Sequence, residues 1–159
     1  MVAALPAGRL FNVEVGIHCC VSAWIRISDN SISPRIKCGS NYQNSCLVML
    51  QAKKDGYDNA IILTGNGKVS EAPGGCLVIV RKGKPVTAPL TSRILESITR
   101  DVMIHLSKEY LNLETEVREI DRTELYVADE AFLCGSGAEI TPSVSIDKYQ
   151  LGDSQVLVH

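Results

Sequence analysis

The arrangement of the apolar residues is the strongest constraint on how this chain of 159 residues can fold. Most apolar stretches are short, and turn-forming residues separate them. Residues 11–17 and 21–27 both alternate between apolar and polar side chains. A period of two predicts two half-buried strands or one long bent strand. The sequence "SDNSISPR" at 28–35 then ends the pattern with turn formers and a proline.

The middle of the chain predicts buried strands joined by tight turns. The run "YDNAIIL" at 57–63 predicts a buried strand, and the Asn66-Gly67 pair after it is typical of a tight hairpin. The segment "CLVIVRKGKPVT" at 76–87 predicts a second strand pair that turns at Gly83.

Two stretches have helical periodicity instead. The first covers residues 40–56, with Ser40 or Asn41 as the cap and Gly56 as the stop. The second covers residues 91–112, where Ser97 or Thr99 can begin a fresh helical turn. The apolar positions at helical spacing are Tyr42, Cys46, Met49 and Leu50 in the first stretch, and Ile94, Ile98, Val102, Leu106 and Tyr110 in the second.

The C-terminal part returns to short elements. We expect a strand at 115–120, a short helix at 121–132, a strand that enters a glycine-rich loop within 132–142, and a strand with a loose end at 144–159. We find no internal repeat, low-complexity segment or linker. The fold class predicted is therefore a mixed α/β (α+β) layered domain that occupies residues 1–159 as a single unit.

Composition narrows the function classes. The net charge is −2, and no basic stripe or amphipathic basic run indicates a nucleic acid or a membrane surface as partner. The longest apolar runs are too short to span a bilayer, and the first residues lack the features of a signal peptide. The six cysteines have no metal-ligand or disulfide spacing, so we expect buried free thiols in a reducing cytoplasm and no metal.

Two charged residues are candidates for chemistry. Lys37 lies between Pro34 and the start of the first helix, in a loop of small residues. A lysine amine that is partly unprotonated can form a Schiff base, although a solvated surface lysine is the commoner case. Glu71 ends a strand before the turn "APGG" and could hold a ring nitrogen or a cation, or could be an exposed turn carboxylate.

Two further segments could bind an anion. Residues 96–101, "ESITRD", begin a helix with free backbone N–H groups, which suits a phosphate; ordinary capping explains the same residues. Residues 135–141, "GSGAEIT", could form a nest of backbone N–H groups or a plain turn. The three histidines are scattered and receive no role.

The order of these segments resembles a known family. The succession "RIKCGSNYQNSCLVMLQAKKDGYDNAIIL", "GKVSEAPGGCLVIV", "TAPLTSRILESITRD", "EIDRTELYVADEAFLCGSGAEITP" and "SIDKYQLGD" is similar to the fold-type IV (class IV) aminotransferases, and most similar to the branched-chain amino acid aminotransferases. The resemblance extends from about Val21 to about Gly152. It implies the large cofactor-binding domain of that fold, with strands in a barrel-like sheet and packed helices.

The resemblance also implies roles for particular residues around the cofactor pyridoxal 5'-phosphate. Lys37 matches the lysine that forms the Schiff base and then shuttles a proton. Tyr42 matches the tyrosine that hydrogen-bonds the phenolic oxygen, and Glu71 matches the carboxylate that pairs with the ring nitrogen. The other matches are Leu95 on the ring, Ile98, Thr99 and Ser136 on the phosphate, and Ser136, Gly137 and Ala138 in the loop that meets the substrate carboxylate.

The implied activity is transamination of leucine, isoleucine or valine with 2-oxoglutarate by a cytoplasmic homodimer. The sequence departs from the family pattern at "EAPGGC", where Ala72 follows the glutamate. Family members also carry a small N-terminal domain and a longer C-terminus, which we expect this chain to lack. The alternatives are therefore a truncated, impaired or inactive cofactor-binding fragment, or a D-amino-acid transaminase or aminodeoxychorismate lyase of the same family.

Overall fold

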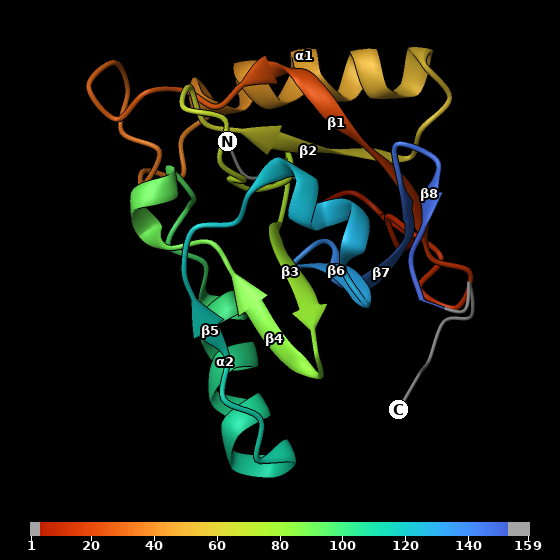
Figure 1. The fold of residues 1–159 in the computed structure, drawn as a ribbon. Coiled ribbons are helices and arrows are strands. Elements are labelled where there is room, and N and C mark those ends of the chain that lie inside the picture. The colour runs from red at the N-terminus through yellow and green to blue at the C-terminus, as the bar shows by residue number, and fades with distance from the viewer. Residues whose placement is uncertain (1–3, 153–159) are drawn as a thin grey trace.

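A single curled sheet organises the computed structural model, which describes residues 4–152 (Figure 1). The strand order is β2-β1-β7-β6-β3-β4-β5, and β8 pairs with β7. The strands are β1 (Ile17–Ile25), β2 (Asn59–Leu63), β3 (Cys76–Arg81), β4 (Lys84–Thr87), β5 (Glu116–Val117), β6 (Glu130–Gly135), β7 (Glu139–Ile146) and β8 (Tyr149–Gln150). The helices are α1 (Asn41–Lys54) and α2 (Ile98–Leu111), with short 3-10 helices η1 (Leu90–Ser92) and η2 (Arg122–Val127).

The sheet is mixed, with parallel pairs towards both ends and antiparallel pairs in the middle. Strand β1 runs parallel to both β2 and β7, and β4 runs parallel to β5. The pairs β3–β4, β3–β6 and β6–β7 are antiparallel. The β1–β7 pair joins the first strand of the chain to the last long one. The predicted mixed fold with a barrel-like sheet is thus confirmed.

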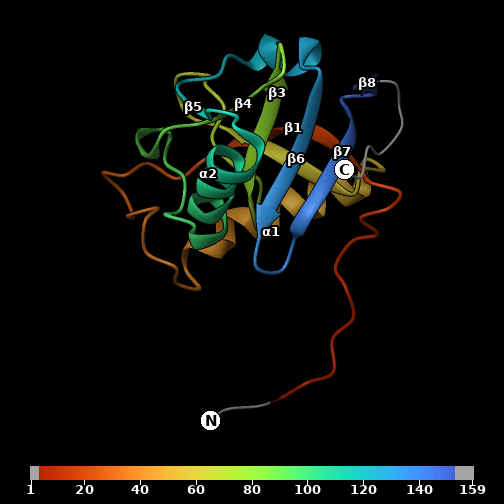
Figure 2. The ribbon, with the colours of Figure 1, turned by 90° about the horizontal axis from the view of Figure 1, so that it is seen from below.

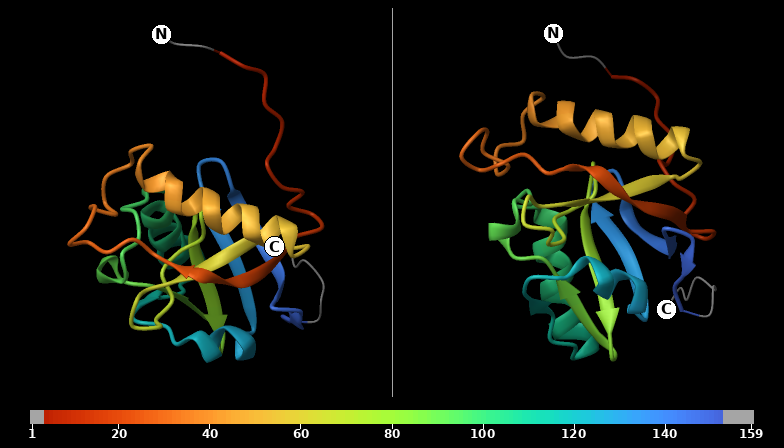
Figure 3. Two further views of the ribbon diagram at one scale, coloured as in Figure 1. Left: turned by 90° about the horizontal axis from the view of Figure 1, so that it is seen from above. Right: turned by 45° about the horizontal axis from the view of Figure 1, so that its top comes forward.

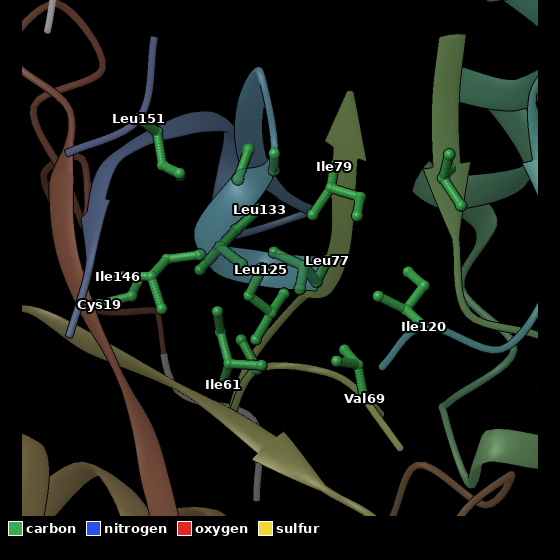
Figure 4. Close-up of a cluster of buried hydrophobic side chains, with 14 of the residues drawn as sticks. Cys19, Ile61, Val69, Leu77, Ile79, Ile120, Leu125, Leu133, Ile146 and Leu151 are labelled. Atoms are coloured by element: carbon green, nitrogen blue, oxygen red, sulfur yellow. The ribbon is translucent and has the colours of Figure 1, made fainter. Parts of the chain in front are cut away.

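The main core lies inside the curl of the sheet (Figure 4). Ile61 of β2 and Ile146 of β7 contribute from one side, and Leu77 and Leu133 of β3 and β6 from the other. Leu125 of η2 lies among them, and all five side chains are almost completely excluded from solvent. Burial of this apolar surface is the main force that holds the curl closed.

Each long helix covers an outer face of the sheet. Helix α1 lies over β1 and β2 (Figure 3), where Val48 and Ala52 pack against Ala60 and Ile62. Helix α2 lies against β3 and β6 (Figure 2), where Met103 packs on a small cluster of buried residues, Cys76, Val78 and Cys134. No helix within residues 4–152 is long and apolar enough to cross a membrane.

The start of the first strand differs from the prediction. Residues 11–16 form turns, because Asn12 accepts hydrogen bonds from two amides instead of extending. Its side chain accepts from the N–H of Glu14 (3.1 Å), and its carbonyl accepts from that of Gly16 (3.0 Å). Gly16 has a φ of 77°, which a residue with a side chain rarely adopts. The predicted strand at 11–17 is therefore wrong, and β1 is one strand.

The buried faces of the two helices also differ from the apolar patterns. Helix α1 buries Asn41 and Ser45 together with Val48 and Ala52, whereas α2 buries Arg100 and Ser107. The predicted apolar positions are largely exposed: Leu50 67%, Ile98 81%, Val102 49%, Leu106 44% and Tyr110 77%. The reason is that polar side chains near the helix starts satisfy backbone groups of neighbouring loops, as the Arg100 guanidinium does for the carbonyl of Ala88.

Other local predictions are confirmed. Turns occur at Asn66-Gly67 and at Gly83, where both glycines have positive φ. Helix α2 begins after Ser97, whose hydroxyl accepts from the N–H of Arg100 (3.3 Å); residues 93–97 of the predicted stretch 91–112 are not helical. The short helix predicted at 121–132 is in part confirmed: η2 ends at Val127, and residues 130–132 belong to β6. The loose end predicted at the C-terminus falls at 153–159, outside the described residues.

The position of the core predicts where stability is concentrated. Leu133→Ala should lower the free energy of unfolding by about 2–5 kcal/mol, because it leaves a cavity in the curl of the sheet. Leu50→Ala, on the exposed face of α1, should change it by less than about 0.5 kcal/mol. Urea unfolding monitored by circular dichroism measures both values, and similar losses in the two variants would contradict the assigned core.

Candidate active site

Four segments far apart in the sequence, together with Arg26, surround a cavity of about 270 Å³. They are the loop and helix start at 34–45, the turn at 71–76, the segment at 95–99 that leads into α2, and the β6–β7 turn at 135–137. The structure brings together the predicted site residues Lys37, Tyr42, Glu71, Leu95, Ile98, Thr99, Ser136 and Gly137 around this cavity. Ala138 does not line it; its side chain is buried.

Lys37 and Tyr42 form one wall of the cavity. The Lys37 amine donates a hydrogen bond to the Tyr42 hydroxyl over 3.1 Å. Asn41, in the first turn of α1, fixes the lysine loop because its side-chain amide donates to the carbonyls of Ser33 (2.8 Å) and Ile36 (2.7 Å). Burial of Asn41 and these two bonds explain why a polar residue occupies the inner face of α1 here.

Glu71 lies at the floor of the cavity and is almost completely buried. One carboxylate oxygen, Oε1, is 2.5 Å from Nη2 of Arg26, which is equally buried. The other, Oε2, accepts the N–H of Leu95 over 3.1 Å. Burial raises the pKa of Glu71, while the positive charges of Arg26 and Lys37 and the Leu95 amide oppose that rise. The carboxylate is therefore a buried acceptor held from two sides.

The opposite side of the cavity is suited to an anion. The Ser97 hydroxyl accepts the N–H of Arg100, which leaves the N–H groups of Ile98 and Thr99 at the start of α2 without a helical partner. The positive end of the helix dipole lies at the same point. Ser136 and Gly137 add exposed small residues from the β6–β7 turn.

Glycines allow two of these segments to approach each other. A side chain at Gly75 would lie 3.0 Å from the carbonyl oxygen of Cys134, and one at Gly135 would lie 3.2 Å from that of Gly74. The turn after Glu71 and the β6–β7 turn therefore pack backbone against backbone. This contact fixes Ser136 and Gly137 relative to the floor of the cavity.

The thiols near the cavity have different environments. Burial raises the pKa of Cys76, beside Glu71, to about 12. A hydrogen bond from Ser40 lowers the pKa of Cys38, next to Lys37. All six cysteines are free. Within residues 4–152, no group of His, Cys, Asp or Glu is placed to hold a metal ion.

The sequence and the fold both match proteins of one known family. The sequence pattern of the family described as "Amino-transferase class IV" matches residues 1–146. The chain belongs to this family. It is 44% identical over 149 residues to a probable branched-chain-amino-acid aminotransferase of Aquifex aeolicus and 41% identical over 158 residues to the branched-chain-amino-acid aminotransferase of Escherichia coli K12.

A solved class IV relative has the same fold. The branched-chain amino acid aminotransferase of Thermobaculum terrenum, in its PLP-form, superposes with a TM-score of 0.87 and 52% identity over 91% of this chain and 47% of that one. The matches with the Aquifex and Escherichia proteins cover 94% and 98% of this chain, and 48% and 51% of theirs. The chain thus spans about half the length of the curated relatives it matches.

Arg26 is a member of this site that the sequence patterns did not indicate. It lies one residue beyond β1, within the alternating pattern at 21–27, and its position between Ile25 and Ile27 indicated an outward-facing strand residue. Its guanidinium instead turns inward to Glu71 and to the carbonyl of Arg93 (3.2 Å). No signal in the sequence links Arg26 to Glu71, which lies 45 residues further along the chain.

The thiol environments predict a labelling order. Because the thiolate is the reactive form, Cys38 should react with iodoacetamide at pH 7 well before Cys19, Cys76 and Cys134, whose burial raises their pKa values. Peptide mass spectrometry of the folded chain measures the order. Labelling of Cys76 before Cys38 would contradict the geometry of the cavity.

Proposed function

We propose that this chain is the cofactor-binding part of a pyridoxal-phosphate-dependent branched-chain amino acid aminotransferase, which transfers amino groups between leucine, isoleucine or valine and 2-oxoglutarate. One observation carries the proposal: an amine, a buried carboxylate and a helix N-terminus from distant segments line one cavity. The names of the relatives in the same family support this choice of substrates over other class IV reactions.

The residues of the cavity fit each chemical part of pyridoxal phosphate. Its phosphate suits the free N–H groups of Ile98 and Thr99 and the Ser136 hydroxyl. Its ring nitrogen suits the Glu71 carboxylate, and its aldehyde suits the Lys37 amine. The apolar side chain of Leu95 offers a surface for the ring. The cavity thus offers hydrogen-bond donors for the phosphate on one side and the negative Glu71 carboxylate for the ring nitrogen on the other.

When bound, the cofactor supplies a carbonyl that reacts with amines and a ring that accepts electrons from the substrate α-carbon. Glu71 holds the proton on the ring nitrogen, because a buried carboxylate is a strong acceptor. Lys37 anchors the cofactor and carries a proton at its amine nitrogen. The Tyr42 hydroxyl, 3.1 Å from that nitrogen, orients the amine toward the cavity.

The substrate carboxylate is expected at the β6–β7 turn. We assign its binding to the backbone of Ser136, Gly137 and Ala138, of which Ser136 and Gly137 are exposed at the cavity. We assign the chain to the large domain of the family fold, and the remaining substrate contacts to a small domain outside this chain. That assignment is consistent with a match to about half of each relative.

We also propose that the complete enzyme is a cytoplasmic homodimer. Six free cysteines fit a reducing compartment. Exposed apolar side chains along α2, including Ile98, Val102 and Tyr110, are of the kind that subunit interfaces cover.

Cofactor attachment tests the proposed function directly. The purified chain mixed with pyridoxal phosphate should develop a visible absorbance band, and borohydride reduction should leave a phosphopyridoxyl group on Lys37. Lys37→Ala should abolish both, because it removes the attacking amine. Spectroscopy and peptide mass spectrometry provide the readouts.

The matched control is Lys53→Ala, which removes an exposed lysine from the last turn of α1 and should leave the band unchanged. If Lys37→Ala and the unaltered chain give the same spectrum, Lys37 is not the anchor. Attachment without amino transfer from leucine to 2-oxoglutarate would assign this chain to cofactor binding alone.

A further inference from the structure

The buried partner of Glu71 is the feature of the site that the proposed function leaves unexplained. The side chains of Arg26 and Glu71 are each only 6% exposed. Placing two charges inside a protein carries a large desolvation penalty, and apolar side chains of similar size can often replace such a pair without loss of stability. A buried ion pair that borders a cavity therefore invites a functional explanation.

The position of Arg26 is determined by three separate elements. Its backbone N–H donates to the carbonyl of Leu63 (2.8 Å), which extends the β1–β2 pairing by one residue. Its Nε donates to the carbonyl of Arg93 (3.2 Å), just before the segment that carries Leu95. Its Nη2 meets Oε1 of Glu71 (2.5 Å). Arg26 thus links the end of the sheet to the floor of the cavity.

We propose that Arg26 is a positioning residue that keeps Glu71 ionised and aimed at the ring nitrogen of the cofactor. This inference rests on the proposed function. Arg26 occupies Oε1 and the Leu95 amide occupies Oε2, so the carboxylate cannot rotate. Each oxygen retains a second lone pair, and Glu71 itself lines the cavity, so the carboxylate still has an acceptor for an N–H group there.

The charge of Arg26 is needed because burial, the largest influence on the pKa of Glu71, favours a neutral carboxyl, and Arg26 opposes it more strongly than the Leu95 amide or Lys37 does. Besides Arg26, the titratable groups that face Glu71 are Lys37 and Cys76. Lys37 is exposed, and the Cys76 thiol is neutral because burial raises its pKa to about 12. Without Arg26, the largest contribution that opposes burial is lost, so the pKa of Glu71 rises further and the neutral carboxyl is favoured. A neutral carboxyl would donate its proton and would no longer hold one on the ring nitrogen.

Two substitutions distinguish an effect of the charge of Arg26 from an effect of its packing. Arg26→Gln keeps a side-chain donor but removes the charge, whereas Arg26→Lys keeps the charge. Infrared pH titration of the cofactor-free chain reports the protonation of Glu71, assigned as the carboxyl band that Glu71→Gln removes. We expect the midpoint to move to higher pH in Arg26→Gln and to remain close to that of the unaltered chain in Arg26→Lys.

Cofactor binding gives a second readout that a packing role would not produce. Arg26→Gln should bind pyridoxal phosphate at least tenfold more weakly than the unaltered chain. Arg26→Gln and the unaltered chain should bind the analogue in which carbon replaces the ring nitrogen equally well, because that analogue has no ring nitrogen to protonate. The control Arg122→Met, which removes a more exposed arginine paired with Asp147, should bind both cofactors as the unaltered chain does.

An unchanged Glu71 midpoint in Arg26→Gln, or equal weakening for both cofactors, would overturn the inference. If Arg26→Gln does not fold, Arg26→Lys decides: retained preference for pyridoxal phosphate over the analogue supports the inference, and loss of that preference overturns it. Failure of the unaltered chain to bind pyridoxal phosphate would instead refute the proposed function. The infrared titration, made without cofactor, still tests the effect of Arg26 on Glu71 in that case.

Discussion

The ion pair between Arg26 and Glu71 is the contact on which the rest of the site depends. It connects the end of β1 to the segment after β2, and through the Leu95 amide it also fixes the approach to α2. Removing one partner of such a buried pair typically costs about 3–5 kcal/mol, because the other charge remains without compensation. The floor of the cavity is therefore held by charge and hydrogen bonding, whereas apolar packing holds the sheet behind it.

The curl of the sheet explains why distant segments meet. The β1–β7 pair closes β1 and β2 over β3 and β6, with the apolar core between them. The loops that follow β1, precede β3, precede α2 and connect β6 to β7 then converge on one cavity. Helices α1 and α2 cover the outer faces, and their N-terminal turns bring Tyr42 and Ile98 to the same place. The class IV family membership agrees with this arrangement.

Much of this could be predicted from the sequence where local signals decide the structure. The turns at Gly67 and Gly83 follow from glycine itself, which adopts the positive φ that these turns require, and the start of α2 follows from Ser97. The faces of the helices could not be predicted, since Asn41 and Arg100 are buried by hydrogen bonds to loops that no periodicity reveals. Arg26 could not be placed for a similar reason: its partner Glu71 lies on another segment, and only the tertiary fold brings the two together.

The state of the ring nitrogen tests this account most directly. Pyridoxal phosphate labelled with ¹⁵N in the ring, bound to the chain and observed by nuclear magnetic resonance, reports whether that nitrogen carries a proton. We predict a protonated ring nitrogen through neutral pH, held by the charge of Glu71, and loss of that state in Glu71→Gln. A ring nitrogen that titrates in the unaltered chain as it does in the free cofactor would contradict it.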